Sequence, residues 1–217
     1  MRLVVFDVDG TLVDSQADII ASMAAAFDAV GRDAPSRQQV LSIVGLSLPV
    51  AMARLAPDAD HDLMVRRYKD SYAALRVTKG ASSSPLYPGA RAALDRLNAR
   101  DDIVLGVATG KSRRGLDGLI ETHGLHGVFV TLQVADFHPS KPHPSMLYTA
   151  LNDAGVAARD AVMIGDTSFD ADMARAAQMP FIGVSWGYHP VSHLTGAYRV
   201  LDDFSELDDA LGALWGQ

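Results

Sequence analysis

The stretch LVVFDVDGT, residues 3–11, indicates more about the fold of this chain than any other segment. Its four leading apolar residues include two β-branched ones, a pattern typical of a strand buried on both faces. Asp7 and Asp9 follow, and carboxylates at the end of a buried strand are costly unless they meet a cation. Together with Gly10 and the Thr11 hydroxyl they suit a Mg²⁺ and phosphate site. A simple strand-end turn is the alternative, since Asp and Gly are common in turns.

Length and composition exclude several classes of protein. At 217 residues, the chain can form one large domain, or a core with a smaller insert. It contains no cysteine, which excludes disulfides, thiolate metal sites and cysteine nucleophiles and fits a reducing cytoplasm. A net charge of −7 argues against a nucleic-acid-binding surface. No apolar stretch approaches the ~18 residues of a membrane span. We therefore expect a cytoplasmic protein that binds neither nucleic acid nor membranes.

Short apolar runs alternate with longer helical patterns, which predicts a parallel sheet with helices on both faces. The expected strands are Leu3–Phe6, Ile103–Val107, Val128–Thr131, Ala161–Ile164, Phe181–Val184 and Tyr198–Leu201. The expected helices between and after them are Ala90–Ala99, Ser112–His123, Pro144–Ala154, Ser168–Ala177 and Phe204–Leu214. Ser112 and Ser168 are expected to cap helix starts, and Gly124 and Gly155 to end helices.

The segment after the first expected strand has a different pattern. Helical stretches at Ala17–Val30, Arg37–Ile43, Pro49–Leu55 and His61–Val77 follow one another without a strand. A plain crossover between parallel strands needs only about a dozen residues, far fewer than this segment. We therefore interpret residues 15–85 as a helical cap inserted into a core of residues 1–14 and 86–217. The predicted fold is α/β: a doubly wound parallel sheet with a smaller inserted helical cap domain.

Polar residues follow the expected strands at their carboxyl ends, where ligands bind in doubly wound sheets. These residues are Asp7, Asp9, Thr109, Gly110, Lys141, Asp166 and Asp170. Each has an ordinary structural interpretation: a helix cap, a solvated lysine, or an acid that favours a helix dipole. Their placement along one edge of the sheet favours a common site over separate structural roles.

The carboxylates in this set suit phosphoryl transfer. Asp7 is the candidate nucleophile, because an aspartate can form an aspartyl-phosphate and divide hydrolysis into two steps. Asp9, two residues later, could protonate the leaving alkoxide and then deprotonate the attacking water. Asp166 would join Asp7 and Asp9 around Mg²⁺. Asp170 could support the metal or orient a lysine.

The remaining residues suit the phosphate itself. The Thr109 hydroxyl and the Gly110 amide, at a helix start, would hold phosphate oxygens. Lys141 would neutralise the negative charge that the nucleophile shares with the phosphoryl group. All three are therefore candidate substrate-binding residues, and Thr109 and Lys141 are also candidate catalytic residues.

Four segments carry a resemblance to a known family. They are Asp7–Ser15, Thr109–Lys111, Lys141-Pro142 and Gly165–Asp170. Together they resemble the four motifs of the haloacid-dehalogenase-like phosphatases, over nearly the whole chain. The resemblance implies a Rossmann-like core, dependence on Mg²⁺ and an aspartyl-phosphate intermediate. It implies the roles given above for the aspartates, Thr109 and Lys141.

Within that family the inserted segment resembles the subclass with a helical cap in the first position. Gly45–Pro49 and Gly183–Tyr188 resemble phosphoglycolate phosphatases and their relatives. The implied partner is a small phosphorylated metabolite, and the implied state is a monomer or homodimer. In the cap, Arg37, Arg54 and the Gly45–Pro49 loop are candidates to contact substrate, since an arginine suits a second anion. Arg54 is the substrate-binding residue expected from this group.

Other functions stay open at this point. The presence of Asp9 disfavours carbon–halogen cleavage, because that reaction releases no alkoxide that would need a general acid. A sugar-phosphate mutase, a pyrophosphatase of the same superfamily or a non-catalytic phosphate-binding protein would keep the same residues. Residues 183–187 match the G-x-S-x-G pattern of α/β-hydrolases around Ser185. That fold needs a histidine after the acid, and none follows Asp202.

Overall fold

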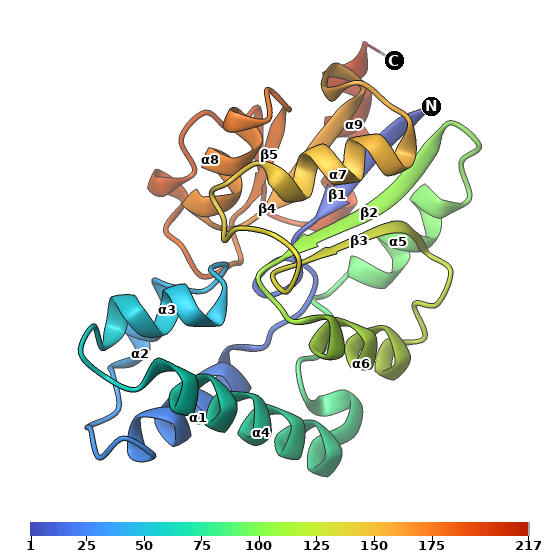
Figure 1. The fold of residues 1–217 in the computed structure, drawn as a ribbon. Helices are drawn as coiled ribbons and strands as arrows, with labels where there is room; N and C mark the ends of the chain where they lie inside the picture. The colour runs from blue at the N-terminus through green and yellow to red at the C-terminus, as the bar shows by residue number, and fades with distance from the viewer. Residues whose placement is uncertain (217) are drawn as a thin grey trace.

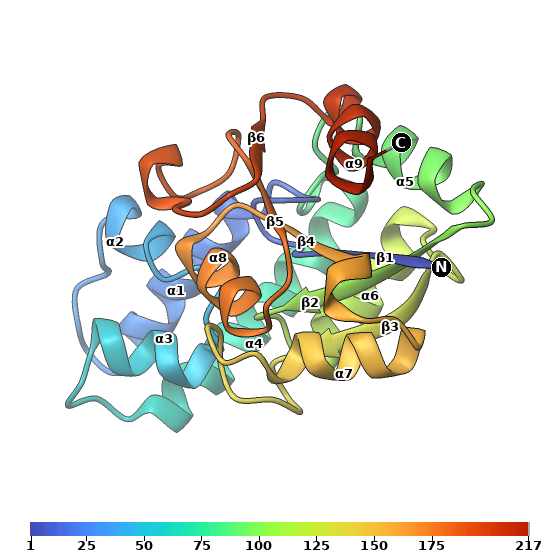
Figure 2. The ribbon, with the colours of Figure 1, turned by 90° about the horizontal axis from the view of Figure 1, so that it is seen from above.

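The computed structural model describes residues 1–216, which form a six-stranded parallel sheet with helices on both sides (Figures 1 and 2). The strand order is β3-β2-β1-β4-β5-β6, and every pair of neighbours is parallel. The strands are β1 (Arg2–Phe6), β2 (Ile103–Thr109), β3 (Phe129–Val134), β4 (Ala161–Gly165), β5 (Phe181–Val184) and β6 (Arg199–Leu201). The predicted α/β fold with a doubly wound sheet is confirmed.

Alternate residues of β1 enter two different cores, one on each face of the sheet. Val4 and Phe6 pack with α5 (Ala90–Asn98), α6 (Arg113–His123) and α9 (Leu207–Trp215). Leu3 and Val5 pack with α7 (Ser145–Ala154) and α8 (Ser168–Ala176). This two-residue period is that of a strand buried on both faces. The central strand is therefore held rigidly, and so is the aspartate that follows it.

Between β1 and α5 the chain forms four α-helices, which we call the helical block. They are α1 (Gln16–Asp28), α2 (Arg37–Leu41), α3 (Leu48–Leu55) and α4 (His61–Lys79). Met23, Phe27, Met52 and Met64 belong to a third core inside this block. Figure 1 shows the block beyond the carboxyl ends of the strands. It therefore lies over the sheet edge where the polar residues were predicted.

Two adjacent segments connect the block to the sheet. The Asp14 amide donates to the Pro85 carbonyl at 2.9 Å, and the Tyr87 amide donates to the Leu12 carbonyl at 2.9 Å. The outgoing and returning chains are thereby tied together at the base of the block. No helix among residues 1–216 is both long enough and apolar enough to cross a bilayer.

Local details differ from the expectation at one helix start. Thr167, not Ser168, caps α8: its side chain accepts from the Asp170 amide, and Asp170 accepts from the Thr167 amide in return. Thr167 has extended backbone angles, whereas Ser168 is already helical. Ser112 caps α6 as predicted, by accepting from the Gly115 amide. Gly124 and Gly155 end α6 and α7 in the left-handed conformation, which confirms those two helix ends.

Candidate active site

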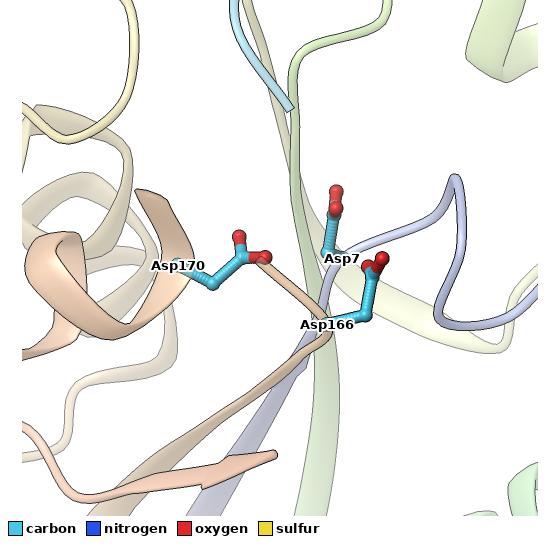
Figure 3. Close-up of side chains that lie close together, drawn as sticks. All are labelled: Asp7, Asp166 and Asp170. Atoms are coloured by element: carbon cyan, nitrogen blue, oxygen red, sulfur yellow. The ribbon is translucent and has the colours of Figure 1, made fainter. Parts of the chain in front are cut away.

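Three buried aspartates, two of which directly follow neighbouring strands, lie together at the carboxyl edge of the sheet (Figure 3). Asp7 follows β1, Asp166 follows β4, and Asp170 lies in the first turn of α8. One carboxylate oxygen from each lies within 4.8 Å of the others. This grouping follows from the topology, because β1 and β4 are hydrogen-bonded neighbours.

Lys141 is the cation inside this group. Its Nζ lies 2.7 Å from Asp170 Oδ1 and 2.9 Å from Asp7 Oδ1. Its side chain is fully buried. Burial alone would lower the pKa of Lys141, but the carboxylates of Asp170 and Asp7 more than offset this and hold its pKa above the ordinary value. The lysine is therefore charged, and it is shared by two acids.

Asp7 is the least satisfied of the three acids. Neither of its carboxylate oxygens has an aligned hydrogen-bond partner, although Lys141 lies within ion-pair distance. Burial raises the pKa of Asp7 to about 7, the charge of Lys141 opposes that rise, and the charge of Asp170 adds to it. A buried carboxylate with unused lone pairs is suited to receive a ligand or to form a bond.

Asp166 is held in place by two donors. It accepts from the Thr11 hydroxyl at 2.9 Å and from the Tyr188 amide at 2.8 Å. Burial, followed by the charges of Asp170 and Asp7, raises the pKa of Asp166 well above its ordinary value. Three buried acids thus face one ammonium. An excess of negative charge in a desolvated site is costly unless protons or a further cation offset it.

The backbone around Asp166 leaves no room for side chains. A Cβ at Gly10 would overlap the Asp166 carboxylate, and a Cβ at Gly187 would overlap the Asp166 side chain. Gly10 also has a φ of +85°, which disfavours any side chain. The two glycines form a tight cradle that sets the position of Asp166.

Gly10→Ala is expected to lower kcat about 100-fold, because a misplacement of about 1 Å in a reacting group can cost that much. The overlap would displace Asp166, and the left-handed φ would add about 1–2 kcal/mol of instability. Gly31→Ala is the matched control: Gly31 has a φ of +66° with nothing within 4 Å of its added Cβ. It should share the loss of stability and keep its activity. Equal activity in the two variants, measured as phosphate release, would contradict the cradle.

Asp9 lies outside the three-aspartate group. Its carboxylate accepts from Lys111 Nζ at 2.7 and 3.0 Å, and from the Ser15 hydroxyl. The Ser15 hydroxyl is itself 3.2 Å from the Tyr188 hydroxyl. Asp9, which the sequence analysis also placed among the metal ligands, is thus paired with Lys111 and Ser15 beside the three-aspartate group.

Lys111 is a site residue that the sequence analysis missed. Its Nζ lies 3.1 Å from the Tyr72 hydroxyl and 4.6 Å from the centre of the Tyr72 ring. Burial would lower the pKa of Lys111, but the nearby Asp9, aided by Tyr72, holds it above the ordinary value. Its place two residues after Thr109 was the available signal. Nothing in the sequence indicates that Tyr72, in the helical block, would meet it.

Thr109 and Gly110 lie where the sequence placed them, at the end of β2. Thr109 is buried, and its hydroxyl accepts from the Lys111 amide at 3.2 Å. A Cβ at Gly110 would lie 2.6 Å from the Gly45 carbonyl oxygen. The helical block therefore packs directly on this turn, and glycine is needed for the close approach.

A cavity of about 360 Å³ lies between the helical block and the core. Asp7, Asp9, Thr109, Gly110 and Lys111 line it from the core, and side chains of α1, α4 and the segment 43–51 line it from the block. Lys141, Asp166 and Asp170 lie close to Asp7 but do not line the cavity. The cavity therefore reaches the site through Asp7 and Asp9.

Three other residues singled out in the sequence do not line this cavity. The Arg54 guanidinium lies 5.2 Å from the centre of the Phe169 ring, so it packs on α8. Arg37 donates to the Gln16 side chain. The Ser185 hydroxyl donates to Asp202 at 2.6 Å. Arg54, expected from the sequence to bind substrate, therefore lies outside the lining of this cavity.

Comparison with known proteins gives consistent results. Residues 4–184 match the family model described as haloacid dehalogenase-like hydrolase. A protein named "Probable phosphatase IndB" from Dickeya dadantii is 33% identical over 98% of this chain and 94% of its own length. The phosphoglycolate phosphatase of Rhodospirillum rubrum is 35% identical over 97% of this chain and 91% of its own. The crystal structure of a hydrolase from Pseudomonas syringae, 22% identical, superposes with a TM-score of 0.85 over 98% of this chain and 99% of its own, a likeness of fold.

Proposed function

Since this chain belongs to the haloacid dehalogenase-like hydrolase family, we propose that it hydrolyses small organic phosphomonoesters through an aspartyl-phosphate on Asp7. The resemblance described from the sequence is confirmed by the family match and by relatives named phosphatases. The observation that supports the mechanism best is the Asp7 carboxylate. It lines the cavity, lies 2.9 Å from Lys141, and has two oxygens without an aligned hydrogen bond.

The group of Asp7, Asp166 and Asp170 fits a divalent cation. Its oxygens lie within 4.8 Å of one another, Asp7 has unsatisfied lone pairs, and one ammonium leaves the buried charge unbalanced. Carboxylate oxygens are the ligands that Mg²⁺ prefers. When bound, Mg²⁺ would offset the negative charge on the transferring phosphoryl oxygens.

In the first step an Asp7 oxygen attacks phosphorus and forms a new P–O bond. The bond from phosphorus to the alkoxide breaks, and protonated Asp9 gives its proton to the leaving oxygen. Lys141 remains beside Asp7 and offsets the charge it shares with the phosphoryl group. The Lys111 ammonium, 2.7 Å from Asp9, would offset the negative charge on Asp9 after the proton has gone.

In the second step a water oxygen attacks phosphorus of phospho-Asp7. The proton of that water passes to Asp9, the bond from phosphorus to Asp7 breaks, and inorganic phosphate leaves with Asp7 restored. The Thr109 hydroxyl and the Gly110 amide, at the end of β2, would hold phosphate oxygens in both steps.

The helical block would serve as a cap of residues 15–85 over a core of residues 1–14 and 86–217. The cavity is lined from both parts, and the block packs on Gly110 beside Lys111. A cap that closes over the reacting phosphate would limit its contact with bulk water. The partner would be a small phosphorylated metabolite in the cytoplasm.

Phosphate release should require Mg²⁺. Activity toward a panel of phosphoglycolate, sugar phosphates and pyrophosphate is expected to disappear with a chelator and return when excess Mg²⁺ is added. Mg²⁺ should also raise Tm, because a cation that binds the folded state stabilises it. Asp166→Asn is expected to abolish that rise in Tm. Full activity in chelator, or the same rise in Tm for Asp166→Asn, would contradict the proposed metal site.

A further inference from the structure

We infer that the substrate is a phosphate monoester whose organic part is apolar and longer than glycolate. The phosphate would lie at Asp7, and the apolar part would lie against the helical block. This inference rests on the proposed function and narrows its substrate class. It comes from the walls of the cavity rather than from the reacting groups.

The wall that the helical block contributes is apolar. It includes Ile19 and Met23 of α1 and Ile43, Val44, Leu46 and Leu48 of the following segments. All but Leu48 are buried, and they belong to the core of the block. A charged or hydroxylated organic group against this wall would lose water without gaining hydrogen-bond partners. An apolar group would displace water from apolar surface on both sides.

An aromatic face continues this wall along α4. Tyr68 and Tyr72, one turn apart, stack with their ring centres 6.0 Å apart and an interplanar angle of 18°. Tyr72 also meets Lys111, which pairs with Asp9. The aromatic surface therefore begins beside the catalytic acid and leads away from it. Such a surface favours an extended carbon chain or a ring on the leaving group.

The cations that line the cavity do not offer a buried position for a second anion. Lys111 already forms an ion pair with Asp9. Lys69 and Arg114 are exposed to solvent. Arg76 lies against α6, where its guanidinium fills the space over Gly118 and is 3.4 Å from the Arg114 carbonyl oxygen. A carboxylate on a substrate held at Asp7 would therefore find no buried, unpaired cation among these four.

The size of the cavity agrees with this chemistry. About 360 Å³ falls within the ~300–1,000 Å³ of pockets that enclose drug-sized ligands. Phosphoglycolate has only two carbon atoms and would leave most of the apolar wall uncovered. A longer apolar group would cover it.

A series of n-alkyl phosphates tests the inference, because ethyl, butyl and hexyl phosphate share one kind of leaving group. With Mg²⁺ present, kcat/KM is expected to rise about threefold to fourfold per added methylene, as burial of ~0.8 kcal/mol per CH₂ implies. Hexyl phosphate should also exceed phosphoglycolate. p-Nitrophenyl phosphate serves as a general phosphatase substrate, since its leaving group needs little protonation.

Two valine variants locate the effect in the cavity. Val44→Thr keeps the shape of the side chain and adds a hydroxyl to the cavity wall, so the ratio of kcat/KM for hexyl over ethyl phosphate should fall at least about threefold. Val40→Thr is the matched control, because Val40 is buried in the same core but does not line the cavity. It should leave the ratio unchanged. The ratio does not depend on how much of either variant is folded.

The outcomes separate this inference from the function on which it rests. Phosphate release with a flat or falling alkyl series, or with phosphoglycolate preferred over hexyl phosphate, would overturn the apolar substrate and keep the phosphatase. An unchanged ratio in Val44→Thr would likewise overturn it. Absence of release from every compound, p-nitrophenyl phosphate included, would overturn the proposed function as well.

Discussion

Asp7→Asn is expected to lower kcat by a factor on the order of 10⁵, the scale seen when a covalent nucleophile is removed. An amide oxygen is a poor nucleophile, although it occupies the same space. The folded state should not suffer, because the variant removes a buried acid whose oxygens lack aligned hydrogen bonds. Lys141 would keep its partner Asp170 at 2.7 Å. Phosphate release and thermal unfolding, measured on the same preparation, check both expectations.

Asp136→Asn is the matched control for that experiment. Asp136 lines the same cavity but is exposed, and it accepts from the Arg113 amide at 2.7 Å. Its loss should cost less than about 1 kcal/mol of stability, through the start of α6. It should change kcat only slightly. A folded Asp7→Asn protein with activity close to that of Asp136→Asn would contradict the role of Asp7.

Lys141→Met is expected to have the largest effect on stability, with a loss of about 3–5 kcal/mol. The variant keeps an unbranched side chain, one heavy atom shorter, but leaves Asp7 and Asp170 buried without their ammonium. Activity should be lost as well, because the charge on the phosphoryl group would be uncompensated. Urea unfolding in the absence of Mg²⁺ measures the free energy of unfolding.

Two comparisons separate charge from packing in this result. Lys69→Met, at an exposed lysine that lines the same cavity, should change stability by less than about 0.5 kcal/mol. Lys141→Met combined with Asp170→Asn should be more stable than Lys141→Met alone, because one uncompensated charge has gone. A Lys141→Met protein as stable as the wild type would contradict the charge balance described here.

The sequence predicts those parts of the fold in which apolar residues follow a strong local pattern. β1 is a continuous apolar run, and its two-sided burial follows from its central place in the sheet. The order of strands and helices then brings Asp7 and Asp166 to one edge without further information. The aspartate group could therefore be expected before any coordinates were known.

The contacts that sequence did not predict join distant segments. Lys111 meets Tyr72 only because α4 folds back over the end of β2, and no local pattern encodes that approach. The contact of Arg54 with the Phe169 ring was likewise not predicted, because the orientation of α3 depends on the core of the block. The capping residue of α8 was misassigned by one position, since Thr167 and Ser168 are both good caps.

Trapping the phosphorylated aspartate tests the central claim most directly. Asp9→Asn mixed with p-nitrophenyl phosphate and Mg²⁺ should still form phospho-Asp7, because nitrophenolate leaves without an acid, and should hydrolyse it slowly, because the base is missing. We expect a burst of about one nitrophenolate per active site. After acid quenching, mass spectrometry should find the phosphoryl group on the peptide that carries Asp7. Nitrophenolate release without a burst, with no phosphorylated peptide, would contradict an aspartyl-phosphate mechanism.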